Sequence, residues 1–520
     1  KKYVVALHLG LNSVDFDAAI TGWENADPNG SDLPANSGVA VSFTQDGNPV
    51  SSPLYLWGSG TTAQRTATVP EGYDAGTFTY SSSNTSVATV DSDGKVTAVA
   101  PGVAVITAST VATKATEYSA VGSYTVYVKT LTAATEAFTG VSSDKSIVYV
   151  GQESDKVQLT ANKTDLTSPE YIWEVQSGSD HLSLSAETGA TVTLNPGASA
   201  GTATIRCIAL GETTAYYQDI PVAVAPDAYT VGGKFSVSSA EQVYFSRGNL
   251  QATYDGSDWS GGFAADQWNY VGNNPGNTSI NGNGTISGTG TVDLFGWVGA
   301  SNTEWEGVAD YGISNSTTRT DYGTVPYESL KKEWATVPGI GGTDWRTMTS
   351  DEWKYVVFDR IGNNCGASVD TSATKSGALA VLSFTTATIN TDEVEGGIVG
   401  FILFPDDVII QRDDVTSWGT PKGDMTNVFS MTTCSTAQWK ALEAKGCVFL
   451  PAAGYRDGNT INYAGNVGCY WSSTASNNYS YVNAHSAYFL YFSYGHFPDR
   501  VYMFVGTRDA MNGSSVRLVR

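Results

Sequence analysis

The chain has few charged residues, and only a minority of them are positive. Charged residues make up 15% of the 520 positions, and 28 Lys and Arg stand against 51 Asp and Glu, which gives a formal net charge of −23. Nucleic acids and anionic membrane surfaces are bound through clustered positive charge. We therefore expect neither of these partners.

Cysteine is scarce as well. The five cysteines are widely scattered and form no CxxC pair, which disfavours a thiolate metal site and a dense disulfide framework. One disulfide in the C-terminal part and buried free thiols both stay open. We expect no cofactor. The cysteines are Cys207, Cys365, Cys434, Cys447 and Cys469.

Long apolar runs are missing, so we expect no membrane-spanning segment in this chain. The first residues read as a strand and carry no visible signal peptide. The terminus alone does not decide between export and the cytoplasm, but the domain content below favours export. We expect an extracellular or cell-surface protein, with a lipid anchor after export as one option.

Common catalytic motifs are also missing: there is no HExxH, no G-x-S-x-G and no P-loop. A carboxylate pair for glycoside hydrolysis stays open, because the separation of two carboxylates is a three-dimensional property. We expect a binding protein and not an enzyme.

A chain of this length suggests three to four domains. Gly and aromatic residues are plentiful, which is typical of a β-rich protein. Residues 1–36 hold one apolar run and a turn cluster. They resemble the closing strands of a fimbrillin-like bacterial adhesin domain. A strand or two packed on the next domain is the alternative.

Residues 37–130 show alternating strands separated by turn signals about every ten residues. Asp91 to Gly94 is predicted to form a tight turn, and Pro101-Gly102 the next one. The segment resembles a group 2 bacterial immunoglobulin-like (Ig-like) domain, and the resemblance implies a spacer in a surface stalk. Residues 131–227 repeat the pattern, which predicts a second Ig-like sandwich with Trp173 in its core.

Residues 228–520 differ in character, because tryptophans become frequent and helical patterns appear. A capping box from Thr349 to Glu352 predicts a helix to about Arg360, and a second one at Ser435 predicts a helix that ends at Gly446. Apolar runs at 397–405 and 448–450 predict buried strands. Short helices among many small strands indicate an α+β domain.

The motifs of this region carry a second resemblance. They are Trp345-Arg346, Phe449 to Arg456, Gly468 to Thr474 and Ser515 to Arg517. They resemble the C-type-lectin-like fold in its formylglycine-generating-enzyme-like branch. More narrowly, they resemble variable proteins that retroelements diversify in gut Bacteroidetes, including Bacteroides, and in their phages. The predicted fold class is therefore multidomain, with all-β Ig-like sandwiches followed by an α+β C-type-lectin-like domain.

The resemblance implies that the tail, residues 469–520, is a ligand surface on a rigid frame. Leu490 and Phe492 share one strand face, and if they point into the core, Tyr491 points out. Tyr455, Tyr470 and Trp471 are expected in the core. Aromatic and amide side chains off the frame suit recognition, as in antibody paratopes. The predicted ligand-binding set is Asn477, Asn478, Tyr479, Tyr481, Asn483, His485, Tyr491, Tyr494, His496, Phe497, Tyr502 and Phe504.

Several alternatives accompany this interpretation. His485 and His496 are expected to make surface contacts and not to bind zinc. Asp406-Asp407 and Asp413-Asp414 are expected in solvated turns, with a calcium site as the alternative. The ligand is an unknown protein or glycan on a cell or phage surface. The alternative functions are an enzyme relative of the formylglycine-generating type, for which Cys447 and Cys469 do not match the family's cysteine pair, and a structural pilus or envelope subunit.

Overall fold

The computed structural model forms two compact units, which are Lys1–Gly140 with Asn162–Ile172 and Ile208–Gln218, and Val141–Ala161 with Trp173–Cys207 and Asp219–Arg520. The predicted domain boundaries at 36, 130 and 227 stay predictions, and residues 1–35 lie outside the described part. The structure describes residues 36–51, 53–112, 117–133, 140–145, 147–154, 156–162, 166, 169–281, 285–297, 313, 315, 317, 344–360, 367–370, 379–382, 384–391, 394–406, 409–410, 429–430, 434–476, 486–497 and 500–520.

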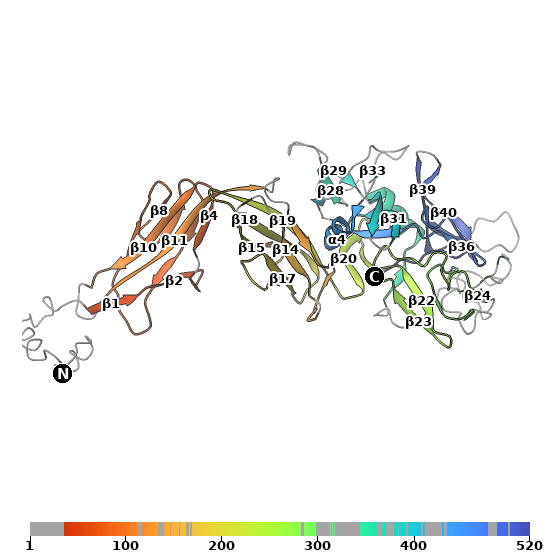
Figure 1. Ribbon diagram of the computed structural model, residues 1–520, viewed down its shortest axis with the longest axis horizontal. Coiled ribbons are helices and arrows are strands. Elements are labelled where there is room, and N and C mark those ends of the chain that lie inside the picture. The colour runs from red at the N-terminus through yellow and green to blue at the C-terminus, as the bar shows by residue number, and fades with distance from the viewer. Residues whose placement is uncertain are drawn as a thin grey trace, which may run out of the picture. The chain divides into compact units, whose positions relative to one another are not determined.

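The described residues are mostly β-strand. The strands up to residue 133 are β1 (Asn36–Ala40), β2 (Ser42–Gln45), β3 (Asn48–Val50), β4 (Leu54–Trp57), β5 (Thr62–Gln64), β6 (Thr66–Thr68), β7 (Thr79–Ser82), β8 (Ala88–Val90), β9 (Lys95–Ala98), β10 (Gly102–Thr110) and β11 (Tyr118–Ala133). Figure 1 shows them in red to orange. Strands β7, β10 and β11 pair antiparallel, whereas β1 and β4 pair parallel with β11. Smaller sheets are β3-β2-β6 and β5-β9-β8.

The sequence pattern explains the local structure of this sandwich. Side chains along β10 alternate between the two faces of the strand. Ile106 on one face is fully buried, whereas Val103 on the other face is exposed, as the strand period of two requires. The predicted turn after β8 is present: Asp91 Oδ1 accepts hydrogen bonds from the backbone N–H of Asp93 at 3.0 Å and of Lys95 at 2.8 Å. Gly94 has φ +85°, which favours glycine.

The next strands are β12 (Val141–Ser143), β13 (Val148–Tyr149), β14 (Gln158–Ala161), β15 (Glu170–Ser177), β16 (Leu182–Leu184), β17 (Thr191–Pro196), β18 (Gly201–Leu210) and β19 (Thr214–Ala225). Strands β12, β14, β17 and β16 form one sheet in that order. Trp173 is 1% exposed and its indole Nε1 donates to the Gly189 carbonyl at 2.8 Å, so its predicted core position is confirmed.

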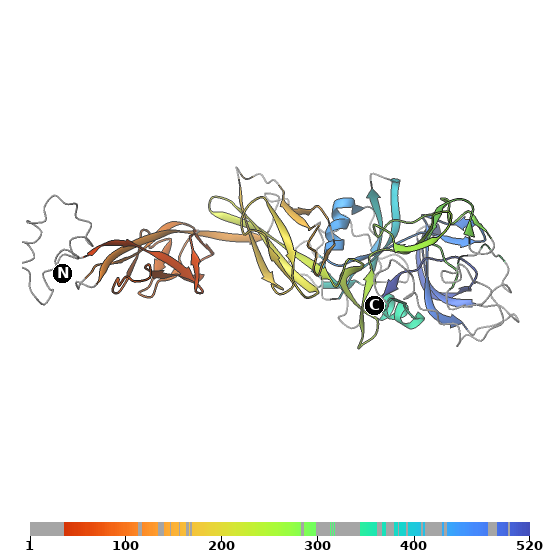
Figure 2. The ribbon, with the colours of Figure 1, turned by 90° about the horizontal axis from the view of Figure 1, so that it is seen from below.

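Residues 228–520 contain short strands and two short α-helices among the described residues. The strands are β20 (Thr230–Ser236), β21 (Gln242–Ser246), β22 (Leu250–Tyr254), β23 (Trp259–Phe263), β24 (Ile280–Asn281), β25 (Thr285–Ile286), β26 (Gly290–Val292), β27 (Arg346–Thr347), β28 (Ala367–Asp370), β29 (Leu379–Leu382), β30 (Phe384–Thr391), β31 (Val394–Leu403), β32 (Ile409–Ile410), β33 (Phe429–Ser430), β34 (Cys434–Ser435), β35 (Val448–Pro451), β36 (Tyr455–Asp457), β37 (Thr460–Asn462), β38 (Val467–Ser476), β39 (Ser486–Phe497), β40 (Arg500–Asp509) and β41 (Leu518–Val519). We call this region the head. Figure 2 shows its helices and strands from a second direction.

Both predicted helices are present. Helix α3 (Ser350–Lys354) continues as the π-helical turn η6 (Tyr355–Asp359) and ends at Arg360. Helix α4 (Thr436–Ala444) follows Ser435, and Gly446 after it has φ +86°. The predicted buried strands are β31 and β35, which pair antiparallel.

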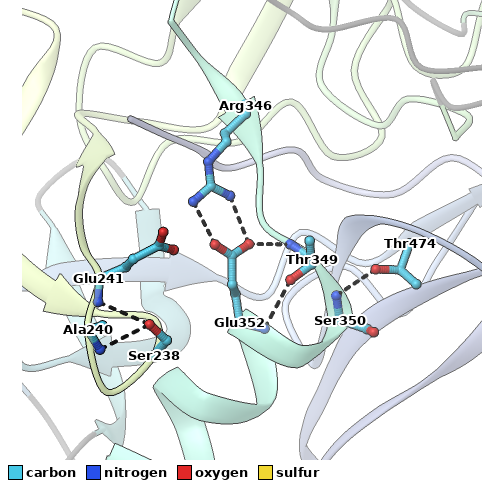
Figure 3. Close-up of polar contacts among 8 residues, drawn as sticks. All are labelled: Ser238, Ala240, Glu241, Arg346, Thr349, Ser350, Glu352 and Thr474. Carbon is cyan, nitrogen blue, oxygen red and sulfur yellow. Dashed lines mark hydrogen bonds and ion pairs between the residues drawn. The ribbon is translucent and has the colours of Figure 1, made fainter.

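Helix α3 begins at a complete capping box (Figure 3). Thr349 Oγ1 accepts from the backbone N–H of Glu352 at 3.2 Å, and the Glu352 carboxylate accepts from the Thr349 N–H at 2.7 Å. The same carboxylate receives two hydrogen bonds from Arg346, at 2.6 and 2.8 Å. Burial raises the pKa of Glu352, but the bonds from Arg346 and Thr349 outweigh burial and hold the pKa below its ordinary value.

The C-terminal strand closes the head onto its own first strands. Strand β41 lies between β21 and β27 in the sheet β20-β21-β41-β27. Phe245 is the cross-strand partner of Val519, and the backbones of Tyr244 and Arg520 exchange hydrogen bonds of 2.9 and 3.0 Å. The two ends of the head are therefore held together by one short ladder.

A buried polar network supports this closure. Arg517 is fully buried, and its guanidinium donates to the side-chain oxygen of Gln267 and, at 3.5 Å, to that of Asn249. Gln267 Nε2 donates to Glu443 of helix α4 at 2.8 Å, and its oxygen accepts from the Phe449 N–H at 2.9 Å. Burial lowers the pKa of Arg517 to about 10, so the residue keeps its charge at neutral pH.

Strands β38, β39 and β40 form an antiparallel sheet between two hydrophobic cores. The first core takes Cys469, Trp471, Ala487 and Phe489 from this sheet. The second core takes Tyr470, Leu490, Phe492 and Met503. Successive residues of one strand thus enter opposite cores, because side chains alternate across a strand.

The interpretation of Asp406 as part of a solvated turn is wrong. Asp406 is 7% exposed, and its carboxylate lies 2.9 Å from Nη1 of the fully buried Arg360. It also accepts from the N–H and hydroxyl of Ser236, at 2.7 and 2.6 Å, and from Gln242 at 2.8 Å. A buried carboxylate requires such partners. Asp407, Asp413 and Asp414 lie outside the described residues.

We expect Gly468→Ala to destabilise the head by about 2 kcal/mol, since a Cβ at Gly468 would overlap the buried ring of Phe492. Urea unfolding followed by tryptophan fluorescence measures the change. The matched control is Gly262→Ala in strand β23, where the added Cβ meets nothing within 4 Å. Equal stability of the two variants would contradict the overlap.

A second prediction concerns pH. Burial raises the pKa of the Asp293 carboxyl to about 6, although Asn277 and the Val271 N–H donate to it. The folded protein therefore holds this proton more tightly than the unfolded chain does, so protonation of Asp293 stabilises the fold. This contribution is complete below the ordinary pKa of 3.8 and is lost as the pH rises through about 6. Between pH 4 and 7, unfolding titrations should show wild type losing about 2 kcal/mol relative to Asp293→Asn. A constant difference between the two proteins would refute the raised pKa.

Candidate functional site

The predicted ligand-binding residues fall in and around the sheet β38-β39-β40. Six of them precede β39 and lie outside the described residues: Asn477, Asn478, Tyr479, Tyr481, Asn483 and His485. The other six lie on the two long strands of the sheet. Tyr491, Tyr494, His496 and Phe497 are in β39, and Tyr502 and Phe504 are in β40.

Tyr491 and Phe504 form the aromatic pair of this sheet. They are cross-strand partners, and their rings stack with centroids 4.7 Å apart and planes 21° apart. Phe504 is 43% exposed, while Tyr491 is half-buried. Stacked cross-strand rings stabilise a strand pair and fix the orientation of both side chains. The pair is therefore a rigid apolar contact surface.

The remaining four residues are placed by their backbone alone. Tyr494 is opposite Val501 and Phe497 is opposite Arg500. Tyr502 is opposite Ser493, two positions along β40 from Phe504, so it has the same register parity as Phe504. The side chains of Tyr494, His496, Phe497 and Tyr502 lie outside the description.

The expectation that Tyr491 simply points away from the core is wrong in part. Leu490 and Phe492 are buried as predicted. The opposite face of β39 is covered as well, because Phe489 is 5% exposed there and Tyr491 packs beside it, with ring centroids 6.1 Å apart. Burial raises the pKa of the Tyr491 hydroxyl above its ordinary value. The first hydrophobic core, against which Tyr491 packs on this face of the sheet, explains the difference.

A further aromatic group borders the pair. It includes Tyr455, which was expected in the core, and Tyr463, which the sequence analysis did not single out. The guanidinium carbon of Arg508 lies 3.4 Å from the ring centroid of Tyr455 and 5.8 Å from that of Phe489. Tyr455 is only half-buried, and Tyr463 is 46% exposed with its ring centroid 6.0 Å from that of Tyr455. The two-residue turn Gly458-Asn459 between β36 and β37 is the hairpin signal that brings these two tyrosines close. Tyr470 and Trp471 are buried, as predicted.

Cys469 lies directly beneath this aromatic group. Its thiol is fully buried and receives a contact of 3.3 Å from Nη1 of Arg508. Burial raises the pKa of the Cys469 thiol to about 11, despite the nearby positive charge of Arg508. Cys207 and Cys447 are also buried, and neither is in a disulfide. A neutral thiol is a poor nucleophile and a poor metal ligand.

Two searches concern metals and membranes. Within the described ranges, no group of three or more His, Cys, Asp and Glu residues is arranged to hold a metal ion. Across the same ranges, no helix has the length and apolar character needed to cross a membrane.

Residues 52–121 match the family of bacterial Ig-like domains, group 2. The resemblance predicted for residues 37–130 is thereby confirmed. A search of curated proteins finds no match for the chain. The interpretation of the tail motifs as C-type-lectin-like therefore depends on their sequence resemblance alone.

The solved structures similar to this chain are distant from it. The S-layer protein SbsC is 18% identical with a TM-score of 0.15, over 41% of this chain and 31% of that chain. The adhesin InvE of Yersinia pseudotuberculosis is 14% identical with a TM-score of 0.14, over 41% and 67%. The D0-D1 domain of Intimin is 15% identical with a TM-score of 0.13, over 35% and 98%. The match spans about a third of the S-layer chain, and similarity this low carries no argument about function.

We expect Cys469 of the folded protein to resist alkylation at pH 7.5. With a pKa of about 11 the thiol is almost fully protonated, so iodoacetamide should react roughly a hundredfold more slowly than with an exposed cysteine. Mass spectrometry of the peptide that contains residue 469 measures the rate. Concentrated urea should restore ordinary reactivity. Rapid labelling of the folded chain at this residue would instead favour thiol chemistry.

Proposed function

We propose that the chain is an exported, surface-located protein that binds a ligand reversibly through its head. The observation that carries this proposal is the stacked pair of Tyr491 and Phe504, which is rigid and partly exposed on the sheet β38-β39-β40. Large rigid rings contribute contact area at low entropic cost, which suits recognition. Residues 37–227 then act as a stalk that displays the head, in keeping with the group 2 Ig-like match at 52–121.

The head is proposed to be a C-type-lectin-like domain of the retroelement-diversified kind. The residues of its tail motifs are buried or hydrogen-bonded, as a rigid frame requires. Trp471 and Arg517 are buried, and Thr474 Oγ1 accepts from the Ser350 N–H at the start of helix α3, at 2.9 Å. The pairing of the first and last strands of the head supports a fold that isolates tail variation from the core.

We propose binding and not catalysis. Cys447 and Cys469 are buried, and the raised pKa of Cys469 weighs against a reactive thiolate such as the formylglycine-generating alternative needs. The ligand is proposed to be a protein or glycan on a cell or phage surface. A structural pilus or envelope subunit, the other alternative, gains no support from a specific contact in the described residues.

A binding screen tests the proposal. The full chain is applied to an array of cell-surface glycans and to a displayed library of random peptides, and dissociation constants are measured for what binds. The double variant Tyr491→Ala with Phe504→Ala should weaken binding at least tenfold, since both rings lose their contact area. Tyr229→Ala, which removes a tyrosine that is 37% exposed elsewhere on the head, should leave binding unchanged.

Two outcomes would contradict the proposal: no saturable binding to either probe, or binding that survives the double substitution. Diversification has its own test in the neighbouring DNA. A reverse transcriptase gene and a near-copy of the segment that encodes residues 469–520 are expected there, and a locus that lacks both would remove this part of the proposal.

A further inference from the structure

We infer that Tyr455 and Tyr463, which precede the tail, extend the ligand face and that this face takes a protein ligand with neutral or basic character. The inference rests on the proposed function of the head. It adds two residues that lie outside the tail, residues 469–520, and it names the class of ligand.

The extended face is a continuous row of rings with one guanidinium in it. The row consists of Tyr463, Tyr455, Arg508, Phe489, Tyr491 and Phe504. Its two ends are the exposed members: Tyr463 is 46% exposed and Phe504 is 43% exposed, whereas Phe489 in the middle is 5% exposed. The buried middle fixes the spacing of the exposed ends, so the row is preorganised for a contact at both ends.

Tyr463 has an unfavourable backbone conformation. Its φ of +57° makes it one of two non-glycine residues with positive φ among the described residues. Asparagine or glycine suits such a position better than a ring-bearing side chain does. The conformation is fixed, because the Tyr463 carbonyl accepts from the N–H groups of Asn466 and Val467, both at 3.0 Å. Strain at an exposed aromatic residue, where burial repays little, indicates a functional constraint.

The opposite end of the row also depends on a special residue. A Cβ at Gly506 would lie 2.6 Å from Cε2 of Phe504, so glycine leaves the space that the Phe504 ring occupies. The ring therefore lies along the strand, next to Tyr491. Both exposed rings are thus held by backbone features and not by chance surface packing.

Arg508 positions the row and does not attract an acidic ligand. One face of its guanidinium lies on the Tyr455 ring, Nη1 contacts Cys469, and Nε is buried. An acidic group on this side is the exposed Asp457, which shares a strand face with Tyr455. With the net charge of −23, this arrangement favours a ligand with basic groups.

Tyrosine and arginine clusters with a buried centre are typical of the energetic centre of protein–protein interfaces. The row has this composition, and its two exposed rings, Tyr463 and Phe504, lie on either side of the buried Phe489 in the sequence of ring contacts. A protein segment that reaches both ends fits this geometry best. A neutral oligosaccharide is the competing ligand, which the experiment separates.

The probe is a phage-displayed library of random dodecapeptides, panned against the full chain, and the strongest binders are synthesised for titration. We expect peptides rich in aromatic residues and in Lys and Arg. Tyr463→Asn should weaken their binding at least tenfold, while the unfolding midpoint stays the same or rises, because Asn relieves the backbone strain. Tyr229→Asn is the matched control, which should change neither.

The outcomes separate this inference from the proposed function. If Tyr491→Ala weakens binding and Tyr463→Asn does not, the extension is wrong and the proposed function stands. If neither weakens binding, both fail. If no peptide binds below about 100 μM, which corresponds to roughly −5.5 kcal/mol, the protein class of ligand is wrong. The same holds if xylohexaose binds and displaces the peptides.

Discussion

The head depends on the pairing of its last strand with its first strands. Strand β41 is only two residues long, yet it joins β21 to β27 and brings Arg517 into the interior. A buried guanidinium costs desolvation energy, which the hydrogen bonds it donates to Gln267 and Asn249 and the nearby charge of Glu443 offset. Because these partners come from distant parts of the chain, Arg517 and Gln267 together link helix α4, strand β35 and the start of β22.

This closure explains how the tail can carry a recognition surface. The sheet β38-β39-β40 lies between two cores, so its register is determined on both faces. A change at an exposed position such as Phe504 removes little buried area, whereas a change at Phe492 removes a core residue. The frame and the proposed ligand face are thus energetically separate, even though they alternate along the same strands.

Local sequence signals predicted much of the fold. The capping box at Thr349 and Glu352, the turn at Asp91 and the core position of Trp173 follow from short-range chemistry, and the structure contains all three. Partners far apart in sequence were not predictable. Asp406 looked solvated because its partners, Arg360 and Ser236, are 46 and 170 positions away. Half of the predicted ligand-binding residues precede β39, outside the described residues, so the candidate site is known chiefly through Tyr491 and Phe504. Tyr455 and Tyr463 were not predicted as ligand-binding residues, because the sequence does not show what fraction of an aromatic side chain is exposed.

The parallel pairing of β1 and β11 has a mechanical consequence for the first sandwich. Strand β1 begins the described chain and β11 is the strand by which the chain leaves this sandwich, and Asn36 to Ala40 run alongside Tyr118 to Val121 in the same direction. Tension applied to the two ends would pull these strands past one another, so their hydrogen bonds would bear the load together and not break one at a time. A sandwich built in this way resists stretching along the line that joins its two ends.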